Sequence, residues 1–145
     1  MRHSILASIL LAFSFAVQAD ELLLSDIKAQ NGVQLSVDEL KQLMPGAKVT
    51  NVLETGSTRN WTNDSDGTFI ASSDARSSRG AGGAKAATAQ GTWHVGDNGT
   101  YCVTLEWKTR SENWCRYIFK VGEKYYGFSS IANGAAKAYS FEFSR

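Results

Sequence analysis

The sequence predicts a mainly β protein, a small antiparallel barrel or sandwich of about eight strands with one N-terminal helix. Three observations lead to that fold class: short segments that alternate apolar and polar residues, turn residues between them, and one stretch with helical start and stop signals. Residues 91–130 hold both cysteines and three of the four tryptophans. We therefore expect the fold to be organised around this stretch.

The chain opens with a segment typical of a secretory signal peptide. Arg2 supplies a positive charge, residues 4–17 form a short apolar run, and residues 17–19 fit a cleavage site before Asp20. A membrane anchor is the weaker alternative, because the run is shorter than a bilayer-spanning helix. We expect residues 1–19 to be removed, which leaves a single β domain at 20–145 with no membrane span, periplasmic or secreted.

A short helix is predicted over residues 35–46. Ser36 and Glu39 have the spacing of a capping box, and flanking leucines can form a hydrophobic staple. Pro45 and Gly46 end the helix. We expect it to plug one end of the barrel or sandwich, after a further helical turn within residues 21–28.

From residue 48 onward the pattern predicts strands. The expected strands are 48–54, 58–62, 68–73, four in the stretch 91–130, and 137–144. Asn98-Gly99 and Gly122-Glu123 are hairpin turn signals, and the second places Phe119 opposite Tyr126. The central stretch is therefore expected to be a four-strand antiparallel meander.

Cys102 and Cys115 are expected to form a disulfide, because they are the only cysteines of an exported chain. The bond would stabilise the fold by roughly 3 kcal/mol in the chain-entropy model. If the apolar faces of 101–107 and 115–121 align, however, the two side chains point apart. We therefore expect a bulge, or a slip by one residue, in the connection 108–113.

The aromatic residues supply one candidate binding surface. Trp61, Trp93 and Trp107 are expected in the core, as in most small β proteins. Trp114 lies on the face opposite Cys115, alongside Arg116 and Lys120. A second packed layer on that side of the strand is the first interpretation, and an exposed binding pair of Trp114 and Arg116 on the outer surface is the alternative.

We predict a mobile loop at residues 76–90, because their Ser, Gly, Ala and basic residues show no periodic spacing of apolar side chains. Arg76, Arg79 and Lys85 could bind an anionic ligand or partner there; a merely solvated loop is the simpler interpretation.

No metal, cofactor or catalytic group is predicted. His94 is the only histidine after residue 19, so a zinc site is disfavoured, and one histidine does not make a triad. Residues 63–67 resemble the start of a calcium loop but lack its closing glutamate, which favours a turn. Residues 20–145 contain 14 basic and 14 acidic residues, a balance that argues against general nucleic-acid binding.

The order of several motifs resembles a family of small exported bacterial proteins classed as a domain of unknown function. The matching pieces are LSVDELKQLMPG, RNWTNDSDGTF, GTWHV with YCVTLEW, and WCRYIFKVGEKYYGF. The resemblance implies a periplasmic or secreted bacterial β domain with a disulfide, and it supplies no catalytic residues to carry over to this sequence. The segment 76–90 is longer than in the family pattern.

The function predicted from these observations is that of an exported, non-enzymatic binding protein for a small ligand or a protein partner. One alternative is an inhibitor of a cell-wall hydrolase or protease, and another is a hydrolase that uses His94. A lipid-sized cavity would favour the first, a rigid protruding loop with a filled barrel the second, and a pocket joining His94 to a carboxylate the third.

Overall fold

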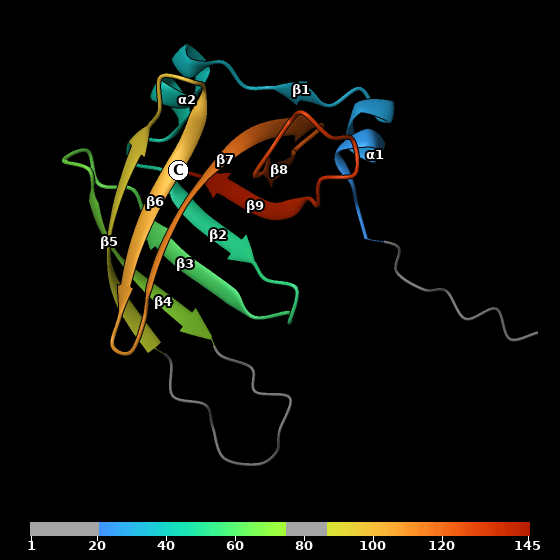
Figure 1. The fold of residues 1–145 in the computed structure, drawn as a ribbon. Coiled ribbons are helices and arrows are strands. Elements are labelled where there is room, and N and C mark those ends of the chain that lie inside the picture. The colour runs from blue at the N-terminus through green and yellow to red at the C-terminus, as the bar shows by residue number, and fades with distance from the viewer. Residues whose placement is uncertain (1–20, 75–86) are drawn as a thin grey trace, which may run out of the picture.

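A computed structural model of the protein describes residues 21–74 and 87–145. Within these ranges, eight antiparallel strands close into a barrel, which confirms the predicted mainly β fold and selects a barrel over a sandwich (Figure 1). The barrel strands are β2 (Lys48–Val52), β3 (Thr58–Thr62), β4 (Thr68–Asp74), β5 (Ala87–Val95), β6 (Thr100–Trp107), β7 (Ser111–Val121), β8 (Lys124–Phe128) and β9 (Tyr139–Ser144). They are preceded by α1 (Leu24–Ala29), β1 (Val33–Gln34) and α2 (Val37–Leu43).

The barrel closes because β8 pairs with both β7 and β9. The remaining neighbours follow the order β7-β6-β5-β4-β3-β2-β9, and β1 adds an extra strand beside the end of β7. The meander β5 to β8 is the one predicted for the central stretch. Its turns contain Gly99 and Gly122 at positive φ, and Phe119 pairs with Tyr126 as expected.

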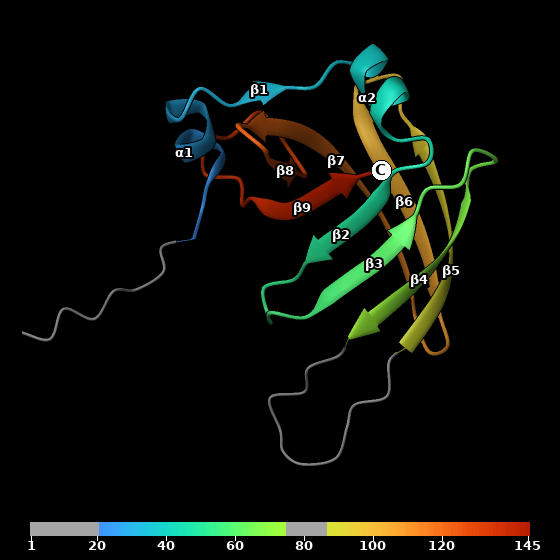
Figure 2. The same ribbon diagram turned by 180° about the vertical axis from the view of Figure 1, so that it is seen from behind.

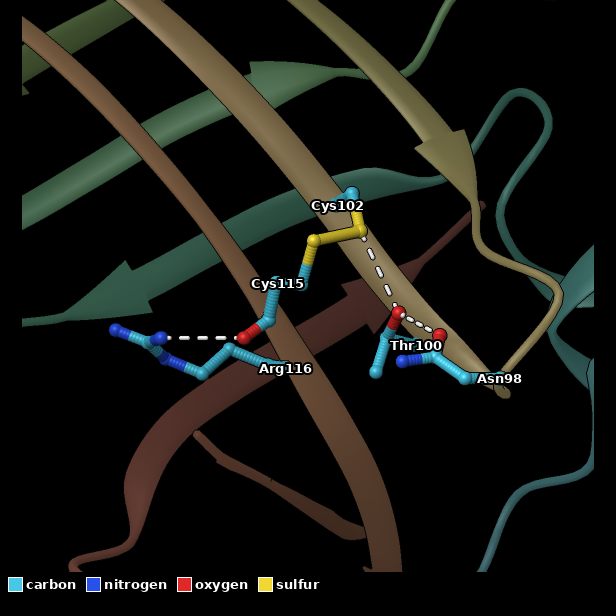
Figure 3. Close-up of a disulfide and its surroundings, with 5 residues drawn as sticks. All are labelled: Asn98, Thr100, Cys102, Cys115 and Arg116. Carbon is cyan, nitrogen blue, oxygen red and sulfur yellow. Dashed lines mark hydrogen bonds between the residues drawn. A yellow bond between two sulfur atoms is a disulfide. The ribbon is translucent and has the colours of Figure 1, made fainter. Parts of the chain in front are cut away.

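The ladder between β6 and β7 is regular, and this corrects the prediction of a bulge or slip. Residues 100–106 pair one to one with residues 111–117, and Cys102 lies directly opposite Cys115. The two sulfurs form the predicted disulfide (Figure 3). The connection between the strands is a turn at residues 108–110, and no irregularity is needed there.

The bulge was predicted because the buried face of β7 was misassigned. Trp114 and Ile118 face the barrel core, whereas Tyr117 and Phe119 pack outside it. The outer cluster also contains Leu24 and Ile27 from α1, and Tyr126 and Phe128 from β8. Both faces of β7 are therefore apolar in part, and alternation alone could not tell which face is inside.

Helix α2 closes one end of the barrel, as predicted. Its first turn carries the capping box: the Glu39 amide donates to Ser36 Oγ over 3.1 Å, and the Ser36 amide donates to Glu39 Oε1 over 3.4 Å. Leu40 and Met44 are fully buried in the barrel core. Figure 2 shows α2 beside the β5–β6 turn, at the end opposite the β6–β7 turn.

Two sequence predictions near the edges of the described ranges have different outcomes. The helical turn expected within 21–28 is α1, which covers the outer cluster. The loop predicted over 76–90 is wrong at its end, because residues 87–90 belong to β5 and pair with β4. Residues 76–86 lie outside the described residues. Neither α1 nor α2, the helices of the described ranges, is long and apolar enough to cross a membrane.

Candidate functional site

At the α2 end of the barrel interior, three neutral polar side chains satisfy one another. Tyr101 Oη donates to Asn63 Oδ1 over 2.7 Å, and Trp61 Nε1 lies 3.0 Å from the same oxygen and 3.1 Å from Tyr101 Oη. Burial raises the pKa of the Tyr101 hydroxyl, despite its hydrogen bonds with Trp61 and Asn63. These groups are enclosed and neutral, so they form a structural network rather than a site.

Toward the β6–β7 end, the interior instead holds a charged pair. Arg59 of β3 and Glu112 of β7 meet through two parallel contacts, Nη1 to Oε1 at 3.0 Å and Nη2 to Oε2 at 2.9 Å. This fork geometry is the strongest form of an arginine–carboxylate pair. The Trp107 indole donates a further hydrogen bond to Glu112, and its ring lies 5.0 Å below the Arg59 guanidinium.

A cavity of about 110 Å³ lies beside this pair. It exists because β8 is much shorter than β7: β8 pairs with residues 117–121, so residues 111–116 have a strand partner only on the β6 side. The cavity occupies the space between that half of β7 and strands β9, β2 and β3. Its lining residues are Asn51, Leu53, Arg59, Glu112, Trp114, Arg116, Tyr139 and Phe141; we call this cavity the arginine pocket.

Arg116 forms a second cationic wall of the arginine pocket. Its guanidinium carbon lies 4.4 Å from the centre of the Tyr139 ring and 5.2 Å from that of Trp114. Nη1 donates to the carbonyl oxygen of Cys115 over 3.2 Å, as Figure 3 shows. Two aromatic rings and one backbone carbonyl thus hold this guanidinium at the pocket without neutralising its charge.

Arg59 has one donor that the protein does not use. Its side chain is 6% exposed, and its two Nη atoms both contact Glu112. The Nε atom is buried and has no hydrogen-bond partner among the described residues. A buried donor without an acceptor is unfavourable by about 1–3 kcal/mol, and more for a charged group.

The charges of the arginine pocket do not balance. Burial alone would raise the pKa of Glu112, but hydrogen bonds and charge from Arg59, with smaller contributions from Trp107 and Arg110, lower it below its usual range. Burial lowers the pKa of Arg116, and Tyr139 opposes that shift; an arginine nevertheless stays charged at neutral pH. The lining therefore carries two positive charges and one negative charge.

The residues predicted from sequence fall in different places. Trp114 and Arg116 do lie together, but they line the pocket inside the barrel wall rather than an outer surface, because Trp114 is on the face of β7 that packs against the barrel core. Arg76, Arg79 and Lys85 lie outside the described residues. Sequence reasoning missed Arg59 and Glu112. Arg59 could have been found, because it lies two residues before the core residue Trp61 and therefore on the same face of the predicted strand.

His94 does not contribute to the arginine pocket. It is exposed and lies opposite Cys102 in the β5–β6 ladder, on the outer face of the barrel. Residues 63–67 form a turn in which Asp66 Oδ1 accepts from the Thr68 amide and hydroxyl. Among the described residues there is no cluster of three or more His, Cys, Asp or Glu side chains able to hold a metal ion.

Comparison with protein families gives a match over most of the chain. The model of a family described as "Protein of unknown function (DUF995)" matches residues 10–115. No curated protein and no solved structure matches the chain significantly. The matched segment contains Arg59, Glu112 and Trp114 of the arginine pocket and both cysteines, but not Arg116.

Proposed function

The chain belongs to the DUF995 family of proteins of unknown function, and we propose that it is an exported, non-enzymatic binding protein that holds a small ligand in the arginine pocket. Export is supported by the signal-like segment 1–19 and by the disulfide, a bond that persists in oxidising compartments. The resulting location is the periplasm or the medium outside the cell.

One observation supports the binding function most strongly: the buried Arg59 Nε has no acceptor in the part of the chain that the structure describes, and Arg59 lines a cavity. Buried donors in folded proteins are almost always paired. A bound ligand that accepts a hydrogen bond from this atom would complete the pairing. The barrel core on the α2 side is filled by side chains, so the ligand would be smaller than a lipid.

The absence of catalysis is supported by the chemistry of the pocket lining. Glu112 is the one carboxylate among the lining residues, and its pKa is lowered by donors that already use its oxygens. A general base works best with a pKa near the operating pH, so Glu112 is poorly suited to that role. No described residue gives an observation that favours the inhibitor or the hydrolase alternative.

Native mass spectrometry of the protein purified from its own cells tests the proposal. We expect a small-molecule adduct on the folded protein that is lost on denaturation. Arg116→Met should reduce the adduct, because it removes one wall of the pocket. Lys108→Met is the matched control. Lys108 is an exposed cation in the β6–β7 turn, so this substitution also removes one positive charge, but outside the pocket.

Two outcomes would contradict the proposal. The first is a protein that carries no adduct and gains none when it is incubated with an extract of its own cells. The second is an adduct retained equally by wild type and Arg116→Met. His94→Ala should leave adduct retention unchanged, and a loss of hydrolytic activity in that otherwise folded variant would favour the hydrolase alternative.

A further inference from the structure

We infer that the ligand of the arginine pocket is a short-chain carboxylate that carries one negative charge. This inference rests on the proposed binding function and adds the chemical class of the ligand. Its carboxylate would accept from Arg59 Nε and the Arg116 guanidinium. Its hydrocarbon part would lie against the rings of Trp114 and Phe141 and the side chain of Leu53, which line the same cavity.

The charge of the pocket selects an anion. Arg59 and Glu112 neutralise each other through both Nη atoms, which leaves the Arg116 charge without a carboxylate among the lining residues. Desolvating a charge without a counter-ion is unfavourable. A ligand with one negative charge brings the net charge of the occupied pocket to zero. A neutral ligand leaves that net charge at one positive charge, and a dianion makes it negative.

The unused donors select an acceptor. Arg59 Nε needs an acceptor and has none among the described residues, and the hydrogen bond from Arg116 Nη1 to a backbone carbonyl uses one of the several N–H donors of that guanidinium. A carboxylate has two oxygens and only accepts hydrogen bonds, so it can satisfy both arginines at once. An amide or alcohol of the same size would add donors where the arginines already supply them.

The size and the lining of the cavity select a short organic acid. The cavity is small, about 110 Å³, which favours a short organic acid over a long acyl chain. Leu53, Trp114 and Phe141 give one side of the cavity an apolar surface that a hydrated inorganic ion such as phosphate could not use.

Isothermal titration calorimetry with matched probes tests the inference. The probes are butyrate, its neutral isosteres butyramide and n-butanol, and inorganic phosphate, titrated into the folded protein at constant ionic strength and neutral pH. We expect butyrate to bind at least tenfold more tightly than butyramide or butanol, and at least tenfold more tightly than phosphate. Arg116→Met should remove most of the preference for butyrate over butyramide, while Lys108→Met should keep it.

Each other result overturns the inference. Equal binding of butyrate and butyramide would show a pocket that takes small neutral molecules, and the proposed binding function would stand. Phosphate binding as tightly as butyrate would show a site for inorganic anions. If no probe binds, the carboxylate class is wrong, and the adduct seen by native mass spectrometry then decides separately whether the pocket binds anything. An undiminished preference in Arg116→Met would place the carboxylate elsewhere.

Discussion

The two ends of the barrel interior solve the problem of burying polar groups in opposite ways. At the α2 end, Tyr101, Asn63 and Trp61 are neutral and pair among themselves. Toward the β6–β7 end, Arg59 and Glu112 are charged and paired, yet one arginine donor is left over. The hydrogen bonds of one end are complete within residues 21–74 and 87–145, whereas the other end lacks one acceptor within those ranges.

This difference teaches how a structural network can be distinguished from a site. A network that serves only the fold ends with its donors and acceptors matched, because each unmatched group lowers stability. A buried group left unmatched beside a cavity is instead a candidate for pairing with something from outside the chain. The predictions below change each end in turn, beginning with the largest expected effect.

Glu112→Gln should destabilise the protein most. It removes the counter-ion of Arg59, whose side chain is 6% exposed, while the 27% exposure of Glu112 moderates the effect. We expect a loss of about 3 kcal/mol in the free energy of unfolding, the low end for breaking a buried ion pair. Urea denaturation measures it. Glu106→Gln is the control, because Glu106 is an exposed carboxylate of β6 that accepts a hydrogen bond from the Ser111 hydroxyl.

If Glu112→Gln behaves like Glu106→Gln, the Arg59–Glu112 pair does not stabilise the fold. The double variant Arg59→Met with Glu112→Gln gives a sharper test. Since it removes the unpaired charge that Glu112→Gln leaves behind, it should be more stable than Glu112→Gln alone.

The same pair should make stability depend on acid pH. The pKa of Glu112 is lower in the folded protein than its usual value, so the unfolded chain binds a proton more readily. The stabilisation by Glu112 is therefore complete above the unfolded pKa of about 4.3 and is lost as the pH falls through the lower folded pKa. The gap in unfolding free energy between wild type and Glu112→Gln should narrow below about pH 4.3. A gap that stays constant down to pH 2 would contradict this reasoning.

At the α2 end, Tyr101→Phe should have a smaller effect. It removes the hydroxyl that donates to Asn63, but Trp61 Nε1 still donates to the same oxygen. We expect a loss of about 1.5 kcal/mol in unfolding free energy. Butyrate binding should stay unchanged, because Tyr101 does not line the arginine pocket. Calorimetry that shows a change in affinity would mean that the two ends are coupled.

Ser36→Ala should have the smallest effect. It removes the hydroxyl that accepts a hydrogen bond from the Glu39 amide at the start of α2. We expect the loss of this helix cap to lower the free energy of unfolding by about 1 kcal/mol. Thermal denaturation should show a lower melting temperature and an unchanged preference for butyrate. An unchanged melting temperature would indicate that packing of Leu40 and Met44, rather than the cap, fixes the helix.

Local signals in the sequence predicted most of the fold. Gly122 and the Asn98-Gly99 pair set hairpin turns, and Ser36 with Glu39 set a helix start, because each signal acts within a few residues. Strand β1 carried no such signal: its two residues form a strand only because Lys120 and Phe119 are available to pair with them. Such a contact depends on the folded arrangement of distant segments.

The site was predicted only in part, for a physical reason. Trp114 and Arg116 were identified as a pair, but their direction depends on which face of β7 meets the core, and both faces are packed. Arg59 and Glu112 come together from strands 53 residues apart in the chain. The cavity between them depends on the length difference between β7 and β8, and no single segment contains that information.

The disulfide has a consequence for the lifetime of a bound ligand. The part of β7 that walls the arginine pocket, residues 111–116, is held by a neighbouring strand only on its β6 edge, and the Cys102–Cys115 bond crosses that edge. Reduction would leave the backbone hydrogen bonds to β6 to hold the wall, so brief outward excursions of this segment would become more frequent. The ligand would then dissociate faster while most of the barrel stayed folded. The residence time of the ligand would thus report the redox state of the compartment in which the protein works.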